Sequence, residues 1–133
     1  MSAKTTLASA LNVKPVTNLL EKEYRIVDGK RTLYPLLFET QQIDPAYESK
    51  SDMINYYYVS GDASGATFVV YSLQCRANDE SKSMRIAQSV KTALNRVFSD
   101  GVYFRTEILQ SIPEAQNAWN TPVEVKLFSG EHV

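Results

Sequence analysis

The chain has 133 residues, of which 44% are hydrophobic and 22% charged, close to an average soluble globular protein and enough for one domain with one core. Its 14 basic and 15 acidic residues give a net charge of -1, which excludes nucleic-acid binding driven by bulk charge alone. The single cysteine, Cys75, excludes an intramolecular disulfide and a thiolate metal cluster within one chain, and so favours a reducing compartment.

The N-terminal region predicts helix followed by a short hairpin. Apolar residues between positions 5 and 20 recur at helical spacing and are interrupted near Pro15, so we expect one helix or two short ones. Asp28-Gly29 is a favoured turn dipeptide between two apolar pairs, which predicts the hairpin. Pro35 has no backbone N–H to donate to a neighbouring strand. We therefore expect the second strand to lie at a sheet edge or to end at Pro35.

Export and membrane insertion are not expected. The first residues, MSAKTTLASALNVKP, place polar residues where a secretory signal needs an unbroken apolar stretch. The apolar runs are short, as in FVVY at residues 68–71, whereas a membrane-spanning helix needs about 20 apolar residues. The sequence therefore predicts a soluble protein that is intracellular when made.

Two long antiparallel strands are predicted after an exposed loop. Residues 40–52 are rich in turn formers and charge, and they predict the loop. Residues 53–60 and 66–77 favour β-structure and are separated by turn formers. In the second of these strands, we expect alternate residues from Thr67 to Ala77 to form the core face. The opposite face includes the polar residues Ser72, Gln74 and Arg76.

An amphipathic helix and two strands complete the predicted order. Residues 78–81 supply an N-cap and carboxylates for the first turn of a helix. Apolar positions from Ile86 to Phe98 recur every three or four residues, and Gly101 is expected to end the helix. Residues 102–112 and 123–127 predict strands, separated by Pro113 and a polar connection. We therefore predict a single α+β domain over residues 1–133, in the order helix, short hairpin, two long strands, helix, two strands. Helices would pack on one face of an antiparallel sheet of about four main strands.

Catalytic groups are sparse. His132 is the only histidine and lies next to the C-terminal residue, which argues against a catalytic triad or a multi-histidine metal site. We expect no catalytic residue, no cofactor and no metal. The carboxylate pairs Asp79/Glu80 and Glu21/Glu23 leave a small carboxylate-dependent enzyme as an alternative, although helix-terminus or surface charge explains both pairs.

The tyrosine-rich strand has two possible explanations. In Tyr56-Tyr57-Tyr58, side chains alternate across the strand, so Tyr57 faces one side and its neighbours the other. Either the chain's own helices and loop cover both faces of this strand, or one face meets a partner. The second alternative is based on the enrichment of tyrosine at interfaces. A scattered, solvated set of basic residues is preferred to a basic stripe, and a nucleic-acid-binding module is disfavoured by the charge balance. The interface candidates are Tyr34, Tyr47, Tyr56, Tyr58, Arg76, Arg105 and Trp119.

The stretch FVVYSLQCRANDESKSMRIAQSVKTALN resembles the tail terminator (tail completion) proteins of long-tailed bacteriophages. In that family a strand ends in a short polar turn with Asp, Glu and Ser, and a helix with an Ala-x-x-Val-x-x-Ala-Leu pattern follows. Here the pattern is Ala87, Val90, Ala93 and Leu94. The N-terminal helix, the short strand at residues 33–35, the proline-containing loop and the tyrosine-rich strand add to the resemblance.

The resemblance implies a structural protein rather than an enzyme. Its subunits would form a ring, typically a hexamer, that caps the tail tube, ends tube polymerisation and presents the surface to which the head docks. The implied partners are further copies of the chain, the tail tube protein and the head-completion protein, with DNA passing through the ring without sequence-specific readout. The implied location is the bacterial cytoplasm during assembly of a phage or prophage tail, and then the virion tail. A head-to-tail connector or minor tail protein of similar fold is the alternative.

Overall fold

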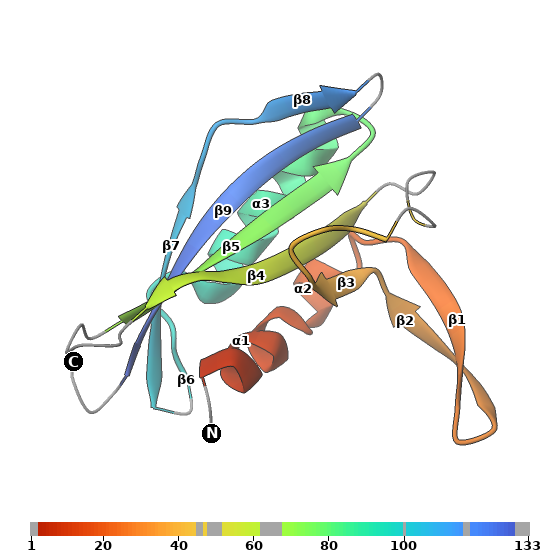
Figure 1. Cartoon of the computed structure of the whole chain (residues 1–133), viewed down its shortest axis with the longest axis horizontal. Coiled ribbons are helices and arrows are strands. Elements are labelled where there is room, and N and C mark those ends of the chain that lie inside the picture. The colour runs from red at the N-terminus through yellow and green to blue at the C-terminus, as the bar shows by residue number, and fades with distance from the viewer. Residues whose placement is uncertain are drawn as a thin grey trace.

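A computed structural model describes residues 3–44, 47, 52–61, 68–99, 101–115 and 118–129. The chain begins with the helices α1 (Ala3–Leu11) and α2 (Lys14–Thr17) and the strands β1 (Lys22–Val27), β2 (Lys30–Pro35) and β3 (Leu37–Glu39). The long strands β4 (Met53–Gly61) and β5 (Phe68–Ala77) lead to the helix α3 (Glu80–Leu94). The strands β6 (Phe98–Ser99), β7 (Val102–Ile108), β8 (Ile112–Ala115) and β9 (Ala118–Ser129) follow (Figure 1).

Two sheets result from this order. The larger sheet has seven strands in the order β3-β4-β5-β9-β7-β6, and β8 pairs with the beginning of β9 beyond the end of β7. All its pairs are antiparallel except β3 with β4, which is parallel. β1 and β2 form a separate antiparallel sheet that projects away from the rest of the molecule in Figure 1.

The predicted architecture is wrong. The described residues are mostly β, with 53% in strands and 24% in helices, and the mixed seven-stranded sheet curls into a half-barrel, whereas we predicted an antiparallel sheet of about four main strands. One reason is that the chain turns at Leu36, directly after Pro35, and adds β3 parallel to β4. A second reason lies in residues 113–122, which we predicted as a break and a connection, whereas residues 113–115 belong to β8 and residues 118–122 to β9.

Two prolines lie inside these C-terminal strands. Pro113 belongs to β8, which pairs only with β9 in the described part of the chain and so has an open side where proline is tolerated. The amide of Leu109 donates to the carbonyl of Pro122 over 2.9 Å. Because the N and O atoms of a strand residue point to the same side, the missing N–H of Pro122 faces the gap between β7 and β8. The ladder between β9 and β5 is therefore left intact.

The predicted local elements of the core are confirmed. Tyr71, Leu73, Cys75 and Ala77 of β5 are buried on the predicted core face, while Thr67 lies outside the described residues. Buried residues of all three helices and of β4, β7 and β9 complete this core, including Leu7, Leu11, Val16, Ile86, Val90, Leu94, Phe104 and Val125. The main chain of Lys82 donates to the Asp79 side chain over 2.8 Å, so Asp79 is the N-cap of α3.

The end of α3 differs from the prediction. The helix stops at Leu94 rather than continuing to Phe98, and Arg96 adopts a positive φ of 62° that ends the helical path. Phe98 instead begins β6, and Gly101, with φ of 77°, makes the turn into β7. The predicted hairpin is confirmed, since β1 and β2 pair around Asp28 and Gly29. No helix in the described ranges is long and apolar enough to cross a membrane.

Candidate functional site

Among the residues that the structure describes, no helix covers one face of the larger sheet. We call this the open face, because the helices contribute their buried side chains to the core on the other side, and Figure 1 shows α3 behind β5 and β9. Directly opposed residues of an antiparallel pair share a face, so the register places side chains from four strands here. They include Asn55, Tyr57, Ser72, Gln74, Arg76, Arg105, Glu107, Asn120, Glu124 and Lys126.

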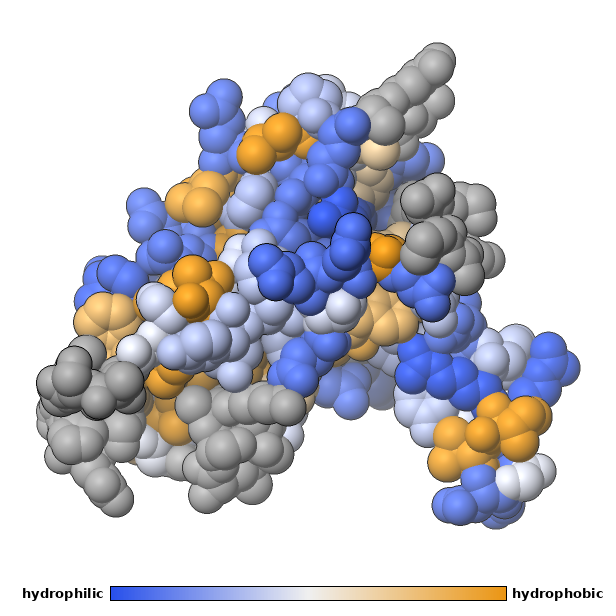
Figure 2. Space-filling view, viewed as in Figure 1, coloured by the Kyte–Doolittle hydropathy of each residue, from blue (hydrophilic) through white to orange (hydrophobic). Residues whose placement is uncertain are grey.

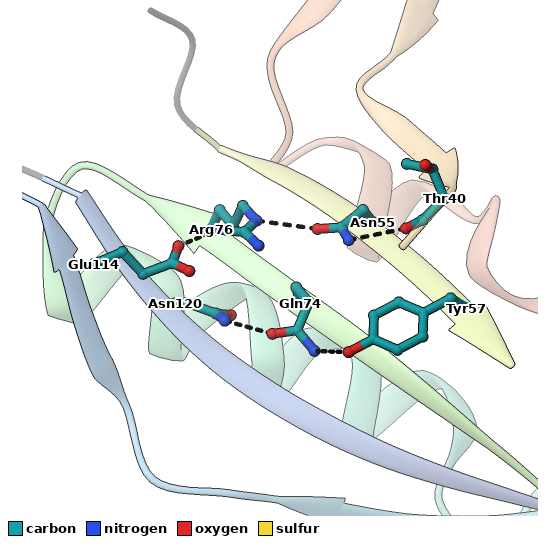
Figure 3. Close-up of polar contacts among 7 residues, drawn as sticks. All are labelled: Thr40, Asn55, Tyr57, Gln74, Arg76, Glu114 and Asn120. Carbon is teal, nitrogen blue, oxygen red and sulfur yellow. Dashed lines mark hydrogen bonds and ion pairs between the residues drawn. The ribbon is translucent and has the colours of Figure 1, made fainter. Parts of the chain in front are cut away.

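Arg76 lies at the centre of a polar network on this face (Figure 3). Its Nε donates to Oδ1 of Asn55 over 3.0 Å, and its guanidinium forms an ion pair with Glu114 of β8. Asn55 is fully buried, and its Nδ2 donates to the carbonyl of Thr40 over 3.0 Å. Arg76 thus connects three strands and, through Asn55, the segment that follows β3. Much of its hydrogen-bonding capacity is therefore used within the chain.

Gln74 forms a second set of contacts beside Arg76. Its amide nitrogen donates to the Ser72 hydroxyl over 2.7 Å and approaches the Tyr57 hydroxyl at 3.5 Å, and its carbonyl accepts from Asn120 of β9 (Figure 3). An amide held at both ends has one fixed orientation. This part of the open face is therefore a preformed polar surface.

Farther along the open face, like charges stand directly opposite each other. Arg105 of β7 is the register partner of Lys126 of β9, and Glu107 is the partner of Glu124. The two rows are two residues apart, about 6.6 Å along the strands. Lys126 Nζ lies 3.9 Å from Glu124 Oε1, and side chains of both rows line one shallow groove. Opposed like charges destabilise a sheet, and neighbouring charges of opposite sign offset this only in part.

A cluster at the base of the β1–β2 hairpin contains two of the predicted interface residues. The Tyr47 hydroxyl donates to Glu23 Oε1 over 2.9 Å, and its ring packs on Phe38 of β3 at 4.8 Å. The hydrogen bond to Glu23 and the burial of the hydroxyl raise the pKa of Tyr47. The Arg25 guanidinium lies 4.9 Å from the centre of the Tyr34 ring and bonds to Glu23. Tyr34 and Tyr47 therefore help to attach the hairpin to the body.

The other predicted interface residues do not gather in one cluster. Tyr56 is only 6% exposed and packs near Tyr71 in the core, where burial raises its pKa, so its ring has little surface to offer a partner. Tyr58 is 56% exposed at the far end of β4 and meets Tyr71 edge-on. Trp119 is half-buried in β9, opposite Ala77. The predicted alternation of Tyr56, Tyr57 and Tyr58 between the two faces is confirmed.

Several groups considered for catalysis have structural roles. Asp79 caps α3, and Glu23 accepts hydrogen bonds from Arg25 and Tyr47. Cys75 is fully buried, and burial raises the pKa of its thiol far above the usual range.

The polar character of Arg105 and Glu107 was visible in the sequence, but their position opposite Lys126 and Glu124 and the burial of the Asn55 amide were not predicted. Alternating charges in residues 123–127 were a visible signal, but the opposing partner of each charge depends on the strand register. Comparisons with protein-family models and with curated proteins find no match for this chain. The open face and the hairpin base therefore have to be interpreted from their geometry.

Proposed function

We propose that this chain is a structural assembly protein of a phage or prophage tail. Its subunits associate into a hexameric ring that caps the tail tube, ends tube polymerisation and forms the surface to which the head docks. The partners are further copies of the chain, the tail tube protein and the head-completion protein, in the bacterial cytoplasm and then in the virion. The resemblance of residues 68–95, which form β5, the turn and α3, is the source of this assignment.

The arrangement of charge on the open face is the observation that supports a protein partner. Arg105 and Lys126 form a cationic row, and Glu107 and Glu124 form an anionic row beside it. Nucleic acid presents one sign of charge and favours a one-signed basic surface, whereas a folded protein surface can match both signs at fixed positions. The polar network around Arg76 and Gln74 holds the neighbouring part of this face in one conformation, which lowers the entropy lost on docking.

The first experiment is to measure the mass of the purified chain. We expect size-exclusion chromatography with light scattering, from micromolar to high micromolar concentrations, to show a ring or a strongly concentration-dependent oligomer. Adding the chain to polymerising tail tube protein from the same genome should shorten the tubes. A monomer at every concentration, together with unchanged tube length, would overturn the proposal. Binding at the tube end distinguishes a terminator from a connector that contacts only the head side.

A charge reversal tests the open face itself. Glu107→Lys places a third cation beside Arg105 and Lys126 and leaves Glu124 alone in its row, so we expect self-association or tube capping to weaken about tenfold. Gln88→Lys adds a positive charge on the exposed side of α3 and is the control, with association expected to change less than about twofold. Equal effects of the two changes would contradict a role for the open face.

A further inference from the structure

The β1–β2 hairpin, residues 22–35, is an arm that extends beyond the larger sheet (Figure 1). Asp28 and Gly29 at its tip have positive φ values of 52° and 75°, the conformation of the two-residue turn that matches strand twist. Six paired residues in each strand give the arm a length of about 20 Å. The arm is therefore long enough to reach a neighbouring molecule.

The two faces of the arm have different surroundings. The inner face carries Glu23, Arg25 and Tyr34, which belong to the cluster that attaches the hairpin to Phe38 and Tyr47. The outer face carries Tyr24, Leu33 and Ile26, whose exposed fractions are 59%, 47% and 72%. Arg31 lies on the same face, with its guanidinium 4.0 Å from the centre of the Tyr24 ring.

This exposed apolar surface is unusual for a two-stranded sheet. An isolated hairpin is at best marginally stable in water, and exposed apolar side chains gathered on one face mark an interaction site. Figure 2 shows hydrophobic residues at the distal end of the arm, away from the body of the molecule. The outer face therefore has the composition of an interface core, with an aromatic and two aliphatic side chains beside an arginine.

We propose that the outer face of the arm docks on the body of a second copy of this chain. The inference rests on the proposed function, since it assigns the contact by which the ring would close. The arm has four basic and two acidic residues, a charge of +2, so the rest of the chain has a charge of -3 out of the total of -1. An arm and a body of opposite charge attract each other between copies. A protruding patch on one copy and a different receiving patch on the next make a head-to-tail contact, which is the type that closes rings.

Neighbouring residues on opposite faces of the arm provide a matched test. Ile26→Ser removes the most exposed apolar side chain of the outer face, and Val27→Ser makes the same kind of change on the inner face, where the side chain is 40% exposed. We expect Ile26→Ser to raise the dissociation constant for self-association about tenfold and Val27→Ser to change it less than about twofold. Circular dichroism should show the same folded state for both variants, because neither side chain belongs to the core.

A fluorescent label reports the arm contact directly. Cys75 is fully buried, so a dye attached to an Ile26→Cys variant labels the arm alone in the folded protein. With a polarity-sensitive dye, we expect a blue shift as unlabelled wild-type chain is added, and no shift with an unrelated protein. Duplex DNA and anionic vesicles are added in separate titrations to test whether the arm binds nucleic acid or a membrane surface instead.

The outcomes separate this inference from the proposed function. If the wild type forms oligomers and Ile26→Ser associates equally well, the inference is overturned and the ring proposal stands. A blue shift only with vesicles or only with DNA also overturns it, since the arm then serves a different partner. A wild type that is monomeric throughout and does not cap tubes overturns both. Selective weakening by Ile26→Ser with a blue shift from added wild type supports the arm contact.

Discussion

Replacing Asn55 tests how strongly the polar network holds the open face together. The side chain is fully buried, donates to the carbonyl of Thr40 and accepts from Nε of Arg76, each over 3.0 Å. Asn55→Ala removes both hydrogen bonds, so the part-buried carbonyl of Thr40 loses this donor and Nε of Arg76 loses this acceptor. Because water cannot fill a site that is closed to solvent without rearrangement, the loss exceeds that of an exposed hydrogen bond.

The magnitude follows from the two bonds. A neutral hydrogen bond contributes about 0.5–1.5 kcal/mol to stability and a bond to a charged group about 1.5–3 kcal/mol. The Arg76 side chain is 27% exposed and keeps its ion pair with Glu114. Solvent and Glu114 therefore compensate in part for the lost hydrogen bond between Asn55 and Arg76. We therefore expect Asn55→Ala to lower the free energy of unfolding by about 2–3 kcal/mol.

Urea unfolding followed by circular dichroism measures this loss, with two-state transitions as the condition for comparison. Tyr57→Phe is the control on the same face, because its hydroxyl receives only a 3.5 Å contact from Gln74, and we expect a change below about 0.5 kcal/mol. In an Arg76→Ala background, Asn55→Ala should cost at least about 1 kcal/mol less, since one of its partners is gone. A loss below about 1 kcal/mol in the wild-type background, or strict additivity with Arg76→Ala, would refute the reasoning.

Two further predictions concern α3 and the core. Asp79→Ala removes the N-cap of α3 and should lower the free energy of unfolding by about 1 kcal/mol, whereas Lys82→Ala keeps the donating main-chain N–H and should have a smaller effect in the same urea titration. Burial raises the pKa of Cys75 far above its usual range, so the folded chain keeps this proton after the unfolded chain has lost it. Stability should therefore be unaffected below the unfolded thiol pKa of about 8.5 and fall above it by about 1.4 kcal/mol per pH unit. Cys75→Ala should lack this loss of stability at high pH. If the free energy of unfolding fell equally with pH in the two proteins, the prediction would be contradicted.

Much of the local structure could be predicted from the sequence because neighbouring residues determine it. The Asp28-Gly29 turn, the cap at Asp79 and the core face of β5 all depend on patterns a few residues long. The helix length could not be predicted in this way. Val97 and Phe98 continue the apolar spacing of α3, but Phe98 pairs with β7 and belongs to strand β6 instead.

The candidate site depends on pairings that no local pattern contains. Glu107 and Glu124 are 17 positions apart, and only the register of β7 with β9 places them side by side. A local prediction ends strands at Pro113 and Pro122. In the structure, Pro113 lies in the edge strand β8, and the missing N–H of Pro122 faces the gap between β7 and β8. The burial of Tyr56 and the exposure of Tyr58, two residues apart on the same face of β4, likewise depend on tertiary packing.

The sequence alone thus determined the turns, the helix start and the alternation of side chains along each strand, since those follow from backbone geometry within a few residues. Tertiary structure decided the rest. It paired β3 in parallel with β4, set like charges opposite each other on the open face, and left the apolar outer face of the arm in solvent. Strand partners are selected by the total burial and hydrogen bonding of the whole sheet, and that sum depends on segments far apart in the chain.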